Sequence, residues 1–322
     1  MALLFIHQLV IWSEIVQAGA VQAGVVQSGV IQSGLLRSLF SDLSAAFSNV
    51  YSGWILWNLF LAGVPLFLSY MLFRREALSR TKIWVALVTI STIGIVGIQP
   101  RIPRIMQAQA QLMNALSAGE QTAQLKVIWW ILLGLISIGM SIFLFNRQKS
   151  TRTVLWWLGL VSFIAFLPNA PYVLTDIIHI IRGVGRGGLR IWVVALVFVP
   201  IHAIAIIAGF EAYVLSILNQ AYYLKKNGKQ QFIFASELLI HAMSAIGIYL
   251  GRFTRVNSWD LATDPTNIIT LTLNTLTTKR PAAVVFVTFI ILTVLYWVAK
   301  QLTLGIKLRI HYSQQGIDAL DL

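Results

Sequence analysis

The chain of 322 residues contains no cysteine. Disulfide bonds, thiolate metal sites and cysteine-held iron–sulfur clusters are therefore excluded. The sequence also lacks a Walker loop, a glycine-rich dinucleotide fingerprint, a His-Glu-x-x-His motif and a nucleophile elbow. A catalytic nucleophile would thus be a serine, threonine, aspartate or glutamate side chain or an activated water, and no motif names a cofactor.

Charged residues are scarce, because they make up only 11% of the chain, whereas an ordinary soluble domain carries roughly 25%. Hydrophobic residues make up 57% and arrive in runs of about 16 to 28 residues, which is the pattern of repeated bilayer crossings. The sequence therefore predicts an all-α, polytopic integral membrane helical bundle. Its expected partner is the lipid bilayer.

The net charge of +13 comes from lysines and arginines clustered at the ends of the apolar runs. This placement is typical of topology signals and of contacts with anionic lipid headgroups, so we expect no nucleic acid partner. Barely more than half of the basic residues gather on one side of the predicted bundle. That slight excess indicates that this side is cytoplasmic and that the C-terminus lies inside.

Seven apolar segments are predicted to span the membrane, namely residues 53–73, 83–98, 127–145, 154–181, 191–218, 232–250 and 282–304. Segment 83–98 is the shortest and would reach only about 24 Å as a helix. The polar stretch 100–126 is predicted to be a loop with one amphipathic helix. A threonine-rich stretch after Asp264 has apolar residues at helical spacing and predicts a helix on the membrane surface.

Residues 16–35 form four pentads in which glutamine is always second and glycine always fourth. A period of five matches neither a helix nor a strand, so the repeat builds no fixed face. We therefore divide the chain into a pentad-repeat low-complexity segment (1–50), a transmembrane helical domain (51–305) and a C-terminal tail (306–322).

The fourth apolar segment contains two prolines and would be about 42 Å long as a single helix, against a hydrocarbon core of about 30 Å. Pro168 and Pro171 lack a backbone N–H, so the helix is expected to break there and free nearby carbonyls such as that of Leu167. Asn169 would then cap a second half-helix. Broken helices of this kind place dipole ends and carbonyls where ions or substrates bind.

Asp176 and His179 are i, i+3 neighbours on this second half-helix. The spacing suits two ligands of one metal ion, or a carboxylate that orients an imidazole for proton transfer. The alternative is a hydrogen-bonded pair at the membrane interface, beside the basic loop 182–190.

Other ionisable residues lie singly in apolar segments. His202 and Glu211 are about 900° apart on a straight helix and so face opposite sides. An ionised Glu211 would cost a few kcal/mol in the bilayer, so this residue should be paired or protonated. Glu237 and His241 are i, i+4 neighbours on the sixth segment, where Glu237 could instead belong to a solvated helix start.

The end of the sixth segment is rich in polar groups. Arg252, Arg255, Asn257 and Asp260 bring two guanidinium groups, an amide and a carboxylate to one helix end. Such a group can bind a charged ligand through bidentate hydrogen bonds. Anchoring to lipid headgroups by arginine and tryptophan is the alternative.

Three strings in the chain are familiar: Trp-Asn-Leu-Phe-Leu-Ala at 57–62, Leu-Pro-Asn-Ala-Pro-Tyr-Val-Leu-Thr-Asp at 167–176, and Gly-Arg-Phe-Thr-Arg-Val-Asn-Ser-Trp-Asp at 251–260. With these strings the chain resembles the bacterial membrane proteins grouped as domain of unknown function 1361, over about residues 54–298. The resemblance implies a protein of the bacterial cytoplasmic membrane and names no reaction. The residues to which it points are Asn169, Asp176, His179, Arg252, Asn257 and Asp260.

Three functional hypotheses follow from these patterns. The first is a carrier or channel-like protein with a polar site at the fourth segment. The second is a metal-dependent hydrolase or transferase acting on a lipid-like substrate, with ligands drawn from Asp176, His179, His241 and Asp260. The third is an accessory or assembly protein without catalysis.

The ends of the fourth and sixth segments should meet at one membrane face. In a bundle of seven spans both segments exit on the same side, so Asp176 and His179 are predicted to face Arg252, Asn257 or Asp260. An arginine there would neutralise the buried carboxylate of Asp176.

Overall fold

The structure is a computed structural model, and it describes residues 37–38, 40–41, 54–146, 153–178, 181, 191–256 and 265–316. The chain divides into two compact units, residues 1–49 and 50–322. The pentad repeats lie outside the described residues, so their assignment to a separate low-complexity segment stays a prediction.

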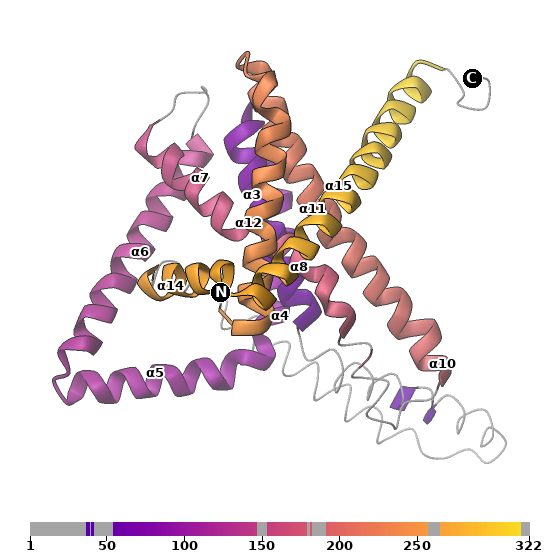
Figure 1. Cartoon of the computed structure of the whole chain (residues 1–322). Coiled ribbons are helices and arrows are strands. Elements are labelled where there is room, and N and C mark those ends of the chain that lie inside the picture. Colours follow the sequence, from indigo (N-terminus) through magenta and orange to yellow (C-terminus); the bar gives the residue numbers. More distant parts are fainter. Residues whose placement is uncertain are drawn as a thin grey trace. The chain divides into compact units, whose positions relative to one another are not determined.

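The second unit is helical throughout its described part (Figure 1). Its long helices are α3 (Trp54–Phe73), α4 (Arg80–Ile98), α5 (Ile102–Ser117), α6 (Gln121–Asn146), α7 (Val154–Phe166), α11 (Val199–Lys226), α12 (Ile233–Tyr249), α14 (Pro265–Thr277) and α15 (Lys279–Gln314). The short α-helices are α8 (Asn169–Tyr172) and α10 (Ile191–Val193). The 3-10 turns are η1 (Arg75–Ala77), η2 (Gln99–Arg101), η3 (Val173–Asp176) and η5 (Gln230–Phe232), and the π-helical turns are η4 (Val194–Phe198) and η6 (Leu250–Thr254).

Seven of the helical segments are long and apolar enough to cross a membrane, which confirms the predicted all-α polytopic class. Helix α6 shows most clearly that these segments suit a membrane. Ala123 and Leu144 are its only buried residues. Its exposed side chains, such as Trp130 and Leu135, are strongly apolar. Side chains of this kind are stable in contact with lipid hydrocarbon rather than water.

The structure shows the form of three further segments. The short second segment is helix α4, which continues through η2 into α5, and α5 has no buried residue, as expected of an amphipathic surface helix. The threonine-rich stretch forms helix α14. Helix α15 continues to Gln314, so the segment after residue 305 begins as a helix rather than as a separate tail.

A helix break at Pro168 and Pro171 is not shown: α7 ends at Phe166 and α8 begins at Asn169, but the backbone between them stays in the helical region. The backbone keeps right-handed helical dihedral angles at Pro168 (φ −59°, ψ −21°) and at Val173 (φ −57°, ψ −27°). The helix tightens instead, because Ala170 N–H donates to the carbonyl of Leu167 at 3.1 Å, and the chain then continues in 3-10 geometry. The Leu167 carbonyl was therefore wrongly expected to be free.

Helix α3 lies at the centre of the second unit and packs against α4, α7, α8 and α11. The core around it contains fully buried side chains such as Met71, Phe163 and Tyr213. A glycine sets the contact of α4 with α3, since a Cβ at Gly97 would lie 2.6 Å from the backbone nitrogen of Trp57. This close approach brings the end of α4 beside the first turn of α3.

The seven spans define two membrane faces. The start of α3, the ends of α4, η3 and η6, and helices α5 and α14 share one face, which we call the Arg255 side. The ends of α3, α11 and α15 share the opposite face, which we call the Lys226 side.

Candidate functional site

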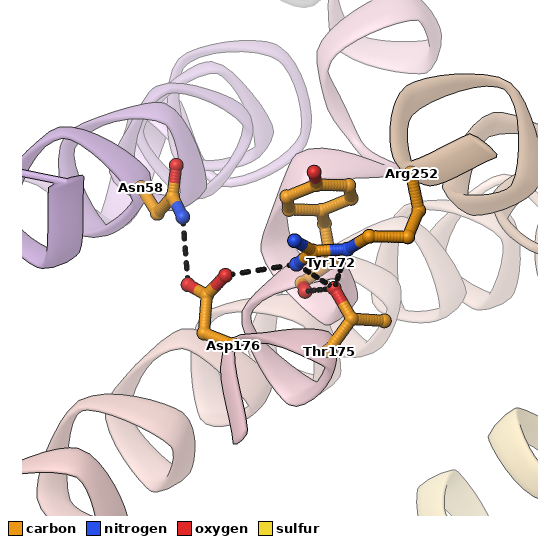
Figure 2. Close-up of polar contacts among 5 residues, drawn as sticks. All are labelled: Asn58, Tyr172, Thr175, Asp176 and Arg252. Carbon is orange, nitrogen blue, oxygen red and sulfur yellow. Dashed lines mark hydrogen bonds and ion pairs between the residues drawn. The ribbon is translucent and has the colours of Figure 1, made fainter. Parts of the chain in front are cut away.

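A buried carboxylate joins three helices at the Arg255 side (Figure 2). Asp176 is 2% exposed, and both of its oxygens accept hydrogen bonds. Oδ1 accepts from Nη2 of Arg252 at 2.9 Å, and Oδ2 accepts from Nδ2 of Asn58 at 2.6 Å. Helix α3 and the turn η6, which follows α12, are thereby tied to the end of the fourth span.

Arg252 is held on its other sides as well. Its guanidinium carbon lies 4.4 Å from the centre of the Tyr172 ring, within the range of a cation–π contact. Its Nε donates to Oγ1 of Thr175 at 3.0 Å, and its Nη2 donates to the same oxygen. Thr175 in turn donates to the Tyr172 carbonyl at 2.6 Å. We call Asn58, Tyr172, Thr175, Asp176 and Arg252 the clamp.

The clamp confirms the predicted contact between the fourth and sixth segments, because Asp176 and Arg252 form an ion pair at 2.9 Å. The pair carries no net charge, and its fork of hydrogen bonds fixes the guanidinium plane. Removing one partner would leave the other as an uncompensated buried charge. The clamp is therefore suited to hold its helices in place.

A cavity of about 600 Å³ lies next to the clamp. Asn58 and Tyr172 belong to both, and most of the other lining side chains are apolar. The apolar and small residues of the wall are Trp57, Leu61, Val161, Ile164, Ala165, Pro168, Met243, Ile246, Gly247, Leu250, Gly251, Val256 and Ile268. The volume is that of a typical small-ligand site, which ranges from about 300 to 1,000 Å³.

Two arginines line the cavity where helices end at the Arg255 side. Arg101 follows α4, its guanidinium carbon lies 5.2 Å from the centre of the Trp57 ring, and its Nη1 donates to the carbonyl of Gly97 at 2.8 Å. Arg255 follows η6 and is exposed. No acidic residue is among the described residues that line this cavity, so its charge is positive.

The backbone of Arg255 is left-handed, with φ 60° and ψ 30°. Among non-glycine residues this conformation costs roughly 1 to 2 kcal/mol. It closes the turn after η6, in which the N–H of Val256 donates to the carbonyl of Leu250 at 3.2 Å. A strained residue that also lines a cavity is a candidate for ligand contact.

The structure brings together four of the predicted site residues. Asp176 and Arg252 form the clamp, while Asn169 and Arg255 line the cavity beside it. Asn169 is not the expected helix cap, because its Nδ2 donates to the carbonyl of Phe166 at 2.9 Å. His179, Asn257 and Asp260 lie outside the described residues.

Glu237 and His241, the pair predicted on the sixth segment, belong to a different group of residues, which we call the seam, between α11, α12 and α15. Glu237 accepts from Nζ of Lys300 at 2.6 Å and from the hydroxyl of Tyr296 at 2.8 Å. The Nδ1 atom of His241 lies 2.7 Å from the hydroxyl of Tyr213. None of the five residues lines the described cavity.

Glu211 and His202 both lie on α11, and their partners are Thr303 on α15 and Phe198 in η4. The carboxylate of Glu211 accepts from the hydroxyl of Thr303 at 2.9 Å, as its apolar surroundings required. The Nδ1 atom of His202 lies 2.8 Å from the carbonyl of Phe198. Neither residue lines the described cavity.

Of the four ligands proposed for a metal ion, His179 and Asp260 lie outside the described residues, so the proposed set stays a prediction. Within residues 54–146, 153–178, 191–256 and 265–316, no three His, Asp or Glu side chains are grouped to hold a metal ion. Asp176 belongs to the clamp and His241 to the seam.

The sequence did not identify three residues that contact predicted site residues, namely Asn58, Tyr172 and Lys300. It also did not identify Arg101, which lines the cavity. Asn58 carried a signal, since it is a lone amide in the first turns of an otherwise apolar span. Lys300 carried another, because it follows directly on a long apolar run. For Arg101, only the close approach of α4 to α3 explains the position.

A comparison with known families gives one match. Residues 129–294, just over half of the chain, match the family described as "Protein of unknown function (DUF1361)". No curated protein and no solved structure matches the chain.

Proposed function

The chain belongs to the family described as "Protein of unknown function (DUF1361)", and we propose that it is a membrane protein that binds an anionic amphiphile in the cavity beside the clamp. Such binding is the step that a carrier needs. The observation that supports the proposal is the lining of the cavity, which has two arginines where helices end at the Arg255 side and mostly apolar side chains elsewhere.

The charge of the cavity favours an anionic head group. Arg101 and Arg255 are its charged lining residues in the described part of the chain. Guanidinium groups bind phosphate and carboxylate through paired hydrogen bonds. The carboxylate of Asp176 does not compete with such a head group for these two arginines, because it is already paired with Arg252.

The extent of the cavity favours a ligand with a hydrocarbon chain. Along α12 and η6 the lining runs from Met243 to Gly251, which corresponds to about 12 Å of helix, and it continues to Val256 after η6. The Met243 end is apolar and points into the depth of the membrane, whereas the arginines lie at the Arg255 side. A head group at the surface and a chain along the wall would match both ends.

The clamp would prepare this site for binding. It joins α3, the α8–η3 turn and η6, and these elements also provide much of the lining. Because these elements are already fixed before the ligand arrives, binding loses less conformational entropy. In this reading Asp176 and Arg252 are positioning residues and do not touch the ligand.

The test is a binding measurement with two matched probes on the protein in nanodiscs. Palmitoyl lysophosphatidate carries a phosphate, and monopalmitoyl glycerol has the same chain without it. Replacing Arg101 or Arg255 by glutamine should weaken phosphate-probe binding about tenfold to a hundredfold, since a hydrogen bond to a charged group contributes roughly 1.5 to 3 kcal/mol.

Arg104→Gln is the matched control, because Arg104 is exposed on α5 and does not line the cavity. Binding of the neutral probe should change little in all three variants. Equal losses in the control and the cavity variants would contradict the proposal. Absence of binding by the unmodified protein would favour the accessory-protein hypothesis.

A further inference from the structure

The side-chain amide of Asn58 is held in one orientation by the clamp. Its Nδ2 donates to Oδ2 of Asp176 at 2.6 Å, and Oδ1 of Asp176 is paired with Arg252. An ionised carboxylate only accepts hydrogen bonds, so the NH2 group of the amide must face Asp176. The carbonyl oxygen of the Asn58 side chain therefore points away from Asp176, as Figure 2 shows.

This oxygen, Oδ1 of Asn58, is available as a hydrogen-bond acceptor for a ligand. Asn58 lines the cavity, and no side chain among the described residues donates to its Oδ1. The two arginines of the lining offer only donors. An acceptor that a ligand shields from water without pairing it costs free energy. A ligand that fills the cavity should therefore bring a donor to Oδ1.

The acceptor lies close to the expected place of the head group. Asn58 is in the first turns of α3, four residues after Trp54, which corresponds to about 6 Å of helix from the Arg255 side. Its neighbour Trp57 contacts Arg101, whose guanidinium carbon lies 5.2 Å from the ring centre. A donor that reaches Oδ1 would thus belong to the part of the ligand that joins the head group to the hydrocarbon chain.

The charge of the lining selects the kind of donor. An ammonium group also donates hydrogen bonds, but Arg101 and Arg255 would repel it, and no acidic residue is among the described lining residues. The carboxylate of Asp176 is already paired with Arg252. A hydroxyl group donates without carrying a charge. It is therefore the donor that suits both Oδ1 and the two arginines.

From this geometry we infer that Asn58 is a specificity-determining residue, whose Oδ1 accepts a hydrogen bond from a hydroxyl group of the ligand. The inference rests on the proposed function and narrows the ligand class. The ligand would be an anionic amphiphile with a free hydroxyl next to its head group. Asp176 acts through Asn58 as a positioning residue, since its charge sets which end of the amide turns away from the clamp.

The experiment measures equilibrium binding of three probes to the protein in nanodiscs. Palmitoyl lysophosphatidate has a free hydroxyl next to its phosphate group. One analogue lacks this hydroxyl, and the other carries it as a methyl ether, which can accept a hydrogen bond but cannot donate one. The unmodified protein should bind palmitoyl lysophosphatidate about tenfold more tightly than either analogue, because the analogues leave Oδ1 of Asn58 without a donor.

A pair of asparagine-to-leucine variants assigns this preference to Asn58. Asn58→Leu removes the acceptor and should bind all three probes with equal affinity. Asn114→Leu is the matched control, because Asn114 is exposed on α5 and does not line the cavity, and it should keep the preference. The ratio of the affinities is the decisive quantity. If Asn58 were only structural, its loss would lower the affinity for every probe by the same factor and leave the ratio unchanged.

The comparison of probes on the unmodified protein needs no variant to fold. Equal affinity for the three probes would overturn the inference. Tight binding of the methyl ether would also overturn it, because the amide would then donate to the ligand instead of accepting. In either case, weaker binding by Arg101→Gln and Arg255→Gln would leave the proposed function standing. Failure of the unmodified protein to bind palmitoyl lysophosphatidate would instead remove both.

Discussion

The clamp and the seam each contain a buried ion pair, and the two pairs lie at opposite ends of one helical segment, α12 with η6. Asp176 and Glu237 are 2% and 7% exposed, and each is paired with one cation. Only the clamp adjoins the described cavity. The two ion pairs thus differ in what lies beside them, since among the described residues the cavity and its two arginines adjoin the clamp and not the seam.

The difference follows from the faces of α12. Met243, Ile246 and Gly247 line the cavity, while Glu237 and His241 turn towards α11 and α15. Tyr296 and Lys300 fill the space on that second side. Helix α12 thus has the closely packed polar residues of the seam on one face and the largely apolar cavity on the other.

The largest expected effect is the loss of the clamp. Asp176→Ala would leave the guanidinium of Arg252 without its carboxylate partner, and breaking a buried pair in this way costs about 3 to 5 kcal/mol. We expect a large fall in the unfolding temperature of the purified protein in detergent. Asp176→Asn keeps a hydrogen-bond acceptor and should lose less, and an unchanged unfolding temperature in Asp176→Ala would refute the structural role of the clamp.

Weakening the seam should have a smaller effect on stability and no effect on ligand affinity. Glu237→Gln removes the charge that Lys300 and Tyr296 contact, and we expect a loss of about 1 to 3 kcal/mol, seen as a moderately lower unfolding temperature. Affinity for palmitoyl lysophosphatidate should stay close to that of the unmodified protein. A fall in affinity as large as that of Arg255→Gln would mean that the seam and the cavity act as one site.

A methyl group between α12 and the Pro168 turn should cost less than removal of the clamp. At Gly247 the new Cβ would lie 2.6 Å from Cβ of Pro168, so Gly247→Ala should destabilise the protein by about 1 to 3 kcal/mol through overpacking. Gly139→Ala is the control, because nothing lies within 4 Å of its Cβ position. If the unfolding temperatures of the two variants fell equally, α12 would not press on this turn.

Much of the architecture was predictable, because long apolar runs can be stable only as membrane-spanning helices. The contact of Asp176 with Arg252 was also predictable, since chain parity alone brings the two segment ends to one face. The path of the chain through Pro168 was not predictable from the sequence. A proline leaves a carbonyl without its usual N–H donor, but neighbouring donors can satisfy that carbonyl. The place of Arg101 depends on a glycine contact between two helices, and no local pattern encodes such a contact.

The smallest effect is expected at Arg255, where stability and binding should change in opposite directions. Its left-handed backbone is disfavoured for arginine and easily adopted by glycine, so Arg255→Gly should raise stability by roughly 1 kcal/mol. The same change removes one of the two cations that line the cavity, so affinity for palmitoyl lysophosphatidate should fall. Arg255→Lys separates the two causes, because it keeps the positive charge and the backbone strain. It should retain most of the binding without becoming more stable. If Arg255→Gly gained stability and kept full affinity, Arg255 would be only a turn residue, and the anionic site would have to depend on Arg101.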